Sequence, residues 1–293
     1  MNEIPVTFEC DGDPLVGILH RPPQAKNVGV VIVVGGGPQY RAGGHRQLSL
    51  WSRRLATAGY PVLRFDYRGM GDSYGTFTGF ENIDDDIRAA VDRLVAEYPE
   101  VDHVVLWGEC DGAAAILYYA YRDPRIKRAV LLNPWARTEA LRAKAVLHHY
   151  YLHRLLEASF WRKVLSLRFN PVASLGSAWS IFMRARKTTQ DRVERATDPT
   201  APLSRALPLP ERLLTGFTRF GGRTMLVMSG RDLIAREFDE LVSSSATWRD
   251  LLRSKGTVRH DLVEADHTFS TATWRDQVID WAVQWLAQTD PRP

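Results

Sequence analysis

The sequence predicts an α/β protein with a mostly parallel central sheet and helices on both of its faces. Apolar segments of strand length alternate with segments of helical periodicity, which is the pattern of parallel strands joined by helical crossovers. One such segment, "VGVVIVV" at 28–34, is an unbroken β-branched run of the kind found in strands buried on both faces. A chain of 293 residues, 45% hydrophobic and 25% charged, suits one large domain or one domain with a sizeable insertion.

The first half of the chain supplies most of the predicted elements. A hairpin is predicted for residues 1–20 because an Asp-Gly pair separates two strand-like runs. Apolar residues recur with helical spacing and end at helix-stop signals, which predicts helices at 47–60, 83–99 and 110–124. Apolar runs between these helices predict strands near 61–66, 102–108 and 126–135.

The alternation is interrupted between 136 and 220 and then resumes. The interrupting range holds an aromatic-rich, helix-like stretch followed by a Pro- and Thr-rich return, which predicts a helical cap inserted between strands. After it, a strand is predicted from 223, a helix at 236–254, a final strand from 258 and an amphipathic closing helix at 272–288.

The inserted range is strongly basic. Residues 136–220 contain 15 Lys plus Arg against 6 Asp plus Glu, although the whole chain has a net charge of only +4. Such a segment could contact an anionic membrane surface or an acidic partner, but a solvated cationic face is the favoured interpretation. Its basic residues are interleaved with apolar ones and carry no recognition motif, so nucleic-acid binding is not expected.

Composition also bears on the compartment. The first residues lack the basic segment and apolar run of a secretory signal, and the longest apolar stretch is far too short to span a bilayer. Cys10 and Cys110 could form one disulfide at most and do not fit a metal-ligand pattern. We therefore expect two reduced thiols in a cytoplasmic protein.

Groups suited to chemistry lie where the predicted parallel strands end. These groups are Gly35–Gly37, Cys110, Asp232 and His267. In open parallel sheets, ligands bind outside the carboxyl ends of the strands. We therefore expect these groups to meet at one edge of the sheet, in the chain order nucleophile, acid and histidine.

The stretch "GECDG" at 108–112 resembles the nucleophile elbow of α/β-hydrolases, with Cys110 in place of the usual serine. The order of Cys110, Asp232 and His267 is also that superfamily's order, and "FDYRGMGDS" is similar to its loop after the fourth strand. The resemblance implies an α/β-hydrolase fold. Its core would comprise 1–135 and 221–293, and 136–220 would be its helical cap.

The elbow "GECDGAAA", together with "VIVVGGGPQYRAGGHRQ" upstream, is similar to a narrower group, the exosortase A system-associated hydrolase 1 family. Members of that family are encoded beside bacterial exopolysaccharide and protein-sorting genes and favour cysteine at the elbow. The family is named for this genomic association, so the resemblance implies little about the substrate.

The residue types then suggest covalent acyl transfer. Cys110 would attack an acyl carbonyl, His267 would exchange the proton with the thiol and the leaving group, and Asp232 would orient the imidazole. The oxyanion would be bound by the backbone N–H of Asp111 and by that of Gly36 or Gly37. Negative charge beside a thiol raises its pKa, so Glu109 and Asp111 are expected to keep Cys110 neutral until His267 activates it.

Other residues keep parts of this assignment open. Cys110 in isolation could be a small buried residue, and Glu237, Asp239 and Asp66 are alternative acids near strand ends. Asp266 is expected to point away from its neighbour His267, because adjacent residues in an extended loop diverge.

Two partial cofactor motifs are incomplete. His148, His149 and His153 include a helical i, i+4 pair but lack a Glu-x-x-His context. The triglycine lacks the Gly-Lys-Ser/Thr of a phosphate loop. Neither a metal nor an organic cofactor is expected.

The sequence therefore predicts an enzyme that hydrolyses an ester or thioester of a small-molecule acyl substrate through Cys110. An acyltransferase is the first alternative, because a thioester acyl-enzyme can react with an amine or alcohol as well as with water. The second is a non-catalytic binding protein on a hydrolase scaffold, whose basic cap would bind a polysaccharide or a protein-sorting partner. No oligomeric state is predicted.

Overall fold

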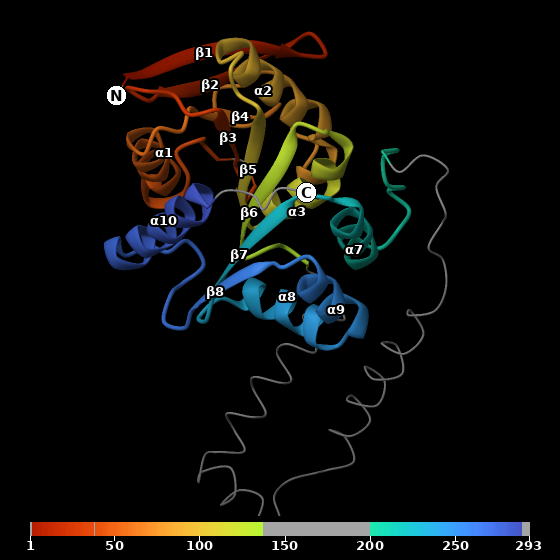
Figure 1. The fold of residues 1–293 in the computed structure, drawn as a ribbon. Helices are drawn as coiled ribbons and strands as arrows, with labels where there is room; N and C mark the ends of the chain where they lie inside the picture. Colours follow the sequence, from red (N-terminus) through yellow and green to blue (C-terminus); the bar gives the residue numbers. More distant parts are fainter. Residues whose placement is uncertain (1, 38, 137–199, 289–293) are drawn as a thin grey trace, which may run out of the picture.

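A single sheet runs through the molecule, for which the computed structural model describes residues 2–37, 39–136 and 200–288. Its strands are β1 (Asn2–Cys10), β2 (Asp13–Arg21), β3 (Val28–Val33), β4 (Val62–Asp66), β5 (His103–Glu109), β6 (Ile126–Leu132), β7 (Arg223–Ser229) and β8 (Val258–Leu262). They lie in the order β1-β2-β4-β3-β5-β6-β7-β8, with the β1–β2 hairpin at one edge (Figure 1).

The sheet is parallel apart from this hairpin. β2 pairs antiparallel with both β1 and β4, and every pair from β4 through β3 to β8 is parallel. In the centre, Val31 of β3 stands opposite Leu63 of β4 and Leu106 of β5, and all three are fully buried. The unbroken apolar runs form these central strands because both faces are covered. The predicted fold class is confirmed.

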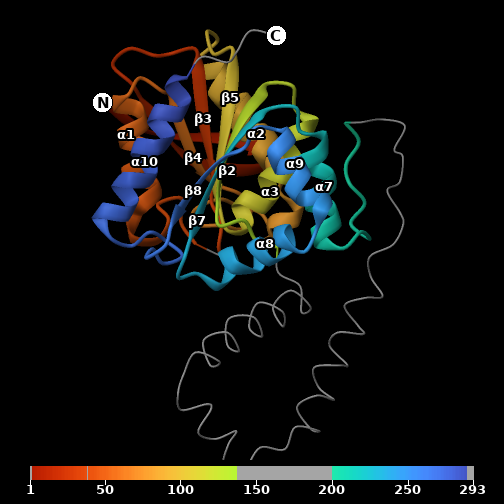
Figure 2. The same ribbon diagram turned by 60° about the horizontal axis from the view of Figure 1, so that its bottom comes forward.

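Helices cover both faces of the sheet. Helices α1 (Gln47–Thr57) and α10 (Ala272–Ala287) lie side by side on one face (Figure 2). The other face carries α2 (Asp84–Glu97), α3 (Asp111–Tyr119), α7 (Leu209–Arg219) and α9 (Ala246–Ser254), with α8 (Leu233–Ser243) leading into α9. Short 3-10 turns are found at Gly44–Arg46, Phe80–Asn82 and Ala120–Arg122.

An aromatic cluster joins the first of these faces to the loop after β8. The Trp51 ring of α1 has its centroid 5.3 Å from that of Trp107 in β5 and 6.2 Å from that of Phe269. The Trp51 indole N–H also donates to the carbonyl of Arg275 at 2.9 Å. Phe269 lies two residues after His267, so the core packing fixes the position of the loop that carries this histidine.

The predicted helix at 236–254 is two helices in the structure. α8 ends at Ser243, and the side chain of Ser245 accepts a hydrogen bond from the Trp248 N–H, which makes Ser245 the N-cap of α9. Serine side chains compete for backbone hydrogen bonds and favour helix starts over helix interiors. The three consecutive serines at 243–245 therefore separate the helices.

Helix α7, which falls within the range expected to be inserted, packs closely on α3. A Cβ added at Gly216 would lie 2.0 Å from the carbonyl oxygen of Leu117, so only glycine permits this approach. Leu213 and Phe217, on the same helix, are buried in the main core. Residues 137–199 of the expected cap lie outside the described residues.

No helix within the described ranges has both the length and the apolar character needed to cross a bilayer.

Candidate active site

Cys110 lies in the tight turn between β5 and α3 and has a positive φ angle. Its φ and ψ are 58° and −126°, a conformation that costs a non-glycine residue about 1–3 kcal/mol. Backbone bonds hold it there, because its N–H donates to the Leu132 carbonyl at 2.9 Å and its carbonyl accepts from the Trp135 N–H at 3.0 Å. This geometry places the thiol at the N-terminus of α3, as in a nucleophile elbow.

The glycines on either side of Cys110 are sterically required. A Cβ at Gly108 would lie 2.7 Å from the carbonyl carbon of Gly112, and a Cβ at Gly112 would lie 2.7 Å from the Val33 carbonyl oxygen. Strand β5, helix α3 and the end of β3 therefore meet at van der Waals distance only because these two side chains are absent. The Gly-x-Cys-x-Gly spacing follows from this crowding.

Asp232 and His267 form a hydrogen-bonded pair beside the elbow. Oδ2 of Asp232 lies 2.7 Å from Nδ1 of His267. Asp232 is also the N-cap of α8 and accepts from the N–H groups of Ile234 at 3.0 Å and Ala235 at 3.2 Å. The helix start thus fixes the carboxylate that orients the imidazole.

His267 also contacts the thiol. The imidazole and the thiol are near enough to shift each other's pKa, and Nε2 is the ring nitrogen that Asp232 leaves free to face the thiol. The three side chains come from the ends of β5, β7 and β8. In the sheet β7 and β8 are adjacent, and β6 separates β5 from β7. The chain of contacts is thiol, imidazole and carboxylate.

The backbone groups expected to bind an oxyanion lie together, but they already have a ligand. Gly36 and Gly37 both have positive φ angles, and the N–H of Gly36 donates to Oδ1 of Asp111. The N–H groups of Gly37, Gly112 and Asp111 itself are near enough to oppose the rise that burial gives to the pKa of this carboxyl group. The sequence indicated the donors but not this arrangement.

Residues 27–202 match the family described as serine aminopeptidase, S33. The chain belongs to this family. It is therefore an α/β-hydrolase enzyme, and at the elbow it carries Cys110 where the family's description implies a serine. No curated protein matches the sequence.

Solved structures of esterases share the fold of this hydrolase. An esterase of Pyrococcus furiosus superposes with a TM-score of 0.63 at 16% identity, over 97% of this chain and 90% of its own. A thermostable carboxyl esterase of Bacillus coagulans gives 0.61 at 14% identity, over 98% of each chain. The esterase domain of a Rhodothermus marinus protein gives 0.57 at 20% identity, over 97% of each. At these identities the likeness concerns the fold.

The other acids weighed for the site of the hydrolase have different partners. Asp66 accepts from the Arg41 N–H at 2.6 Å, and Asp239 pairs with Arg259 at 2.7 Å. Asp266 accepts from the Ser270 N–H at 3.0 Å and turns away from its neighbour, as expected. Glu237 is fully buried within α8. Asp232 is the acid of this set that bonds to His267.

Burial and charge shift the pKa values of the thiol and the imidazole. Burial raises the pKa of Cys110, and the Asp111 carboxylate adds to the rise, while the bond to His267 opposes it. Burial alone would lower the pKa of His267, but its bonds to Asp232 and Cys110 outweigh burial and raise it. Burial and the Asp111 carboxylate thus favour the neutral thiol, and the bond to Asp232 makes the imidazole beside it more basic.

Asn133, which the sequence did not single out, ties the loop of His267 to the sheet. It is fully buried and has a φ of 45°. Its Nδ2 donates to Ser229 Oγ at 2.9 Å and to the His267 carbonyl at 3.0 Å, and its Oδ1 accepts from the Ser229 N–H at 2.8 Å. An Asn just after a strand gives no sequence signal that separates this role from an ordinary turn.

Substituting Asn133 by alanine is expected to lower both kcat and stability. The substitution leaves the Ser229 N–H and the His267 carbonyl without a buried partner, so the free energy of unfolding should fall by about 1–3 kcal/mol. Loosening of the histidine loop should lower kcat by about tenfold, as for other groups that orient a catalytic ligand. Denaturant unfolding and ester turnover measure the two effects. Ser229→Ala removes one acceptor but keeps the bond to His267, so an equal loss of kcat in both variants would contradict the positioning role.

Glu109 provides a second carboxyl group close to the imidazole. From the sequence it was expected only to act as a charge near the thiol. Its Oε2 accepts a hydrogen bond from Gln47 Nε2, while Oε1 is buried with no partner. Burial raises the pKa of Glu109 to about 8, with His267 acting to lower it. The carboxyl group is thus neutral at pH 7.

The Glu109 carboxyl group should make the hydrolase less stable as the pH rises. In the unfolded chain it ionises near its ordinary pKa of 4.5, so between about pH 4.5 and 8 the folded state binds more protons. Stability should fall across this window by up to about 1.4 kcal/mol per pH unit. Thermal unfolding of the wild type and Glu109→Gln at pH 5 to 8 tests this, since the variant should lose less Tm over the range. Equal slopes would show that Glu109 is ionised in the folded protein.

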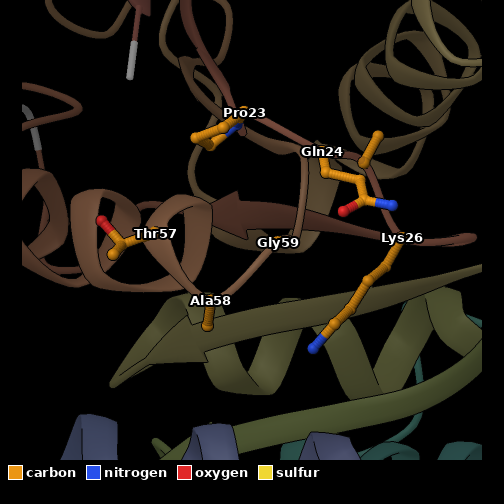
Figure 3. A pocket seen from close by; sticks show the side chains of 7 residues that line it. Pro23, Gln24, Lys26, Thr57, Ala58 and Gly59 are labelled. Atoms are coloured by element: carbon orange, nitrogen blue, oxygen red, sulfur yellow. The ribbon is translucent and has the colours of Figure 1, made fainter.

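Neither a second pocket nor a metal-binding group adds to this site among the described residues. Figure 3 shows the pocket lined by Pro23–Lys26 and Thr57–Gly59. These residues precede β3 and β4, so the pocket lies at the amino ends of the parallel strands, whereas Cys110 follows the carboxyl end of β5. Among the described residues, no three acidic, histidine or cysteine side chains form a metal-binding group. His148, His149 and His153 lie outside those residues.

Proposed function

We propose that this hydrolase cleaves an ester or thioester of a small molecule through a covalent acyl–Cys110 intermediate. The observation that carries the proposal is the strained elbow at Cys110, whose thiol lies beside an imidazole held 2.7 Å from Asp232. A nucleophile, a base and an orienting acid in hydrogen-bond contact are the signature of nucleophilic catalysis. The narrower resemblance to hydrolases encoded beside exosortase A genes agrees with cysteine at the elbow.

In the first half-reaction, Cys110 Sγ forms a bond to the acyl carbonyl carbon while His267 Nε2 takes the thiol proton. The tetrahedral intermediate then expels the leaving group, which receives that proton from His267, and a thioester remains on Cys110. The Asp232 carboxylate stabilises the imidazolium.

In the second half-reaction, water attacks the thioester and gives a proton to His267. The intermediate collapses to a carboxylic acid, and Sγ leaves as a thiolate that regains its proton from the imidazolium. An amine or alcohol attacks by the same route, which makes acyl transfer the alternative outcome. The protein chain supplies each acid–base step through its own residues.

The setting of the site completes the proposal. We propose a cytoplasmic enzyme with a hydrolase core of 1–135 and 221–293 and a cap inserted at 136–220, of which α7 packs on the core. The basic residues of that cap are proposed to form a solvated face. A small-molecule acyl substrate is proposed, without nucleic acid.

Turnover of short-chain p-nitrophenyl esters and acyl thioesters tests this function. The proposal expects saturable release of p-nitrophenol or free thiol, with the acid as product. When hydroxylamine or a short alcohol is added, the product divides between the free acid and the acyl conjugate. A ratio of conjugate to acid far above the molar ratio of added nucleophile to water identifies a transferase. No turnover of any donor would favour a binding protein on a hydrolase scaffold.

A further inference from the structure

Asp111, the residue directly after the proposed nucleophile, turns its side chain back onto the loop after β3. Its Oδ1 accepts a hydrogen bond from the Gly36 N–H. The N–H groups of Gly37, Gly112 and Asp111 itself are near enough to favour its ionised form. The carboxylate thus lies among the donors that an oxyanion would need and occupies that of Gly36.

The surrounding backbone is shaped around this carboxylate. A Cβ at Gly35 would lie 2.6 Å from Asp111 Oδ1 and 2.2 Å from the Glu109 carbonyl oxygen, so the glycine loop reaches the elbow only without a side chain there. Gly36 and Gly37 have positive φ angles of 92° and 73°. Successive N–H groups in such a turn form a concave anion-binding site.

An acyl oxyanion and the Asp111 carboxylate compete for the same donors. Preorganised N–H groups accelerate acyl transfer because they face the place where negative charge develops, and they can do so only when unoccupied. Burial raises the pKa of this half-buried carboxyl group, and the backbone N–H groups oppose the rise; once ionised, it accepts charge-assisted bonds, which are among the stronger hydrogen bonds. The described conformation therefore has its thiol and imidazole assembled and its oxyanion site filled.

We propose that Asp111 is an internal ligand of the oxyanion hole, which an acyl carbonyl must displace before Cys110 can be acylated. This inference rests on the proposed function and adds a resting state to it. The side chain must leave the Gly36 and Gly37 N–H groups as the carbonyl oxygen enters, so the displacement lowers the rate of acylation. If Asp111 only supported the loop, removing its carboxylate would lower the rate of acylation.

Asp111→Ala is expected to raise the limiting rate of acylation by p-nitrophenyl acetate at least tenfold. Asp111→Asn keeps the size of the side chain but accepts hydrogen bonds less strongly, so its rate should lie between those of the wild type and the alanine variant. It also serves if the alanine variant fails to fold. The burst of p-nitrophenol in stopped flow measures acylation directly. Glu109→Gln, which removes the carboxyl group on the other side of Cys110, should give no such rise.

The Asp111 charge also raises the pKa of the thiol. Alkylation separates that effect from the required displacement of the Asp111 side chain, which we call the gate. Iodoacetamide alkylates Cys110 at a methylene carbon without forming an oxyanion. Its rate at high pH, where the thiol is fully ionised, should change less than twofold in either Asp111 variant, while the acylation rate at the same pH rises.

Three results would overturn the gate. Acylation could rise only in parallel with alkylation, which would assign the effect to the thiol pKa. It could fall in both Asp111 variants, which would assign Asp111 a supporting role. If Cys110 is alkylated but acylated in no variant, the proposed function fails and the gate fails with it, whereas the first two results leave the function intact.

Discussion

Replacing Cys110 by alanine is expected to lower ester turnover by about 10⁴- to 10⁶-fold, the range found when a covalent nucleophile is removed. Without Sγ there is no acyl-enzyme, and the remaining imidazole and N–H groups can only assist direct attack by water. Steady-state release of p-nitrophenol measures the loss. A Cys110→Ala variant that keeps more than about 1% of the wild-type kcat would contradict the nucleophile assignment.

Cys10 provides a matched control within the same chain. It is as buried as Cys110, and burial, with the Asp86 carboxylate adding to it, raises the pKa of Cys10 to about 12. It has no histidine partner among its described hydrogen bonds, where its thiol lies beside Asp11. Cys10→Ala should therefore keep its activity, and thiol reagents near neutral pH should label Cys110 in preference to Cys10.

Asp232→Asn is expected to lower kcat by about 10⁴-fold, as in other triads where the acid becomes an amide. The amide N–H would face Nδ1 of His267, which favours the tautomer that carries its proton on Nε2 and cannot accept one from the thiol. Asparagine is nearly as good an N-cap as aspartate, so α8 should keep its start and the Tm should change little.

Activity and thermal unfolding of two variants measure these effects separately. Asp232→Ala also removes the cap and should lose about 1 kcal/mol of stability in addition to its activity. If Asp232→Asn keeps more than a tenth of the wild-type kcat at an unchanged Tm, the carboxylate is a helix cap and not the orienting acid.

Much of the fold was predictable because local signals agreed with one another. The β-branched run at Val28–Val33 is typical of a strand in the centre of a sheet, buried on both faces. The glycines on either side of Cys110 indicate a tight strand-to-helix turn, which has no room for side chains at their positions. The helix break at Ser245 was missed because helical periodicity continues across it, and only the capping chemistry of the serine marks it.

The site was harder to predict because it depends on where side chains turn. Sequence order favoured Asp232, but Asp66 and Asp239 could be set aside only once their arginine partners were seen. Asn133 carries no motif, since its role comes from the way the ends of β6 and β7 meet. Asp111 was expected to contribute its backbone N–H, and the rotation that sends its carboxylate to Gly36 has no signature in the sequence.

The central claim, a thioester on Cys110, is tested most directly by rapid acid quench of the wild-type enzyme during turnover of p-nitrophenyl acetate, followed by intact-protein and peptide mass spectrometry. The account predicts one acetyl group, located on the peptide that contains Cys110, sensitive to neutral hydroxylamine and absent from Cys110→Ala. Continued turnover with Cys110 unmodified, or an acetyl group on another residue that forms at the turnover rate, would contradict it.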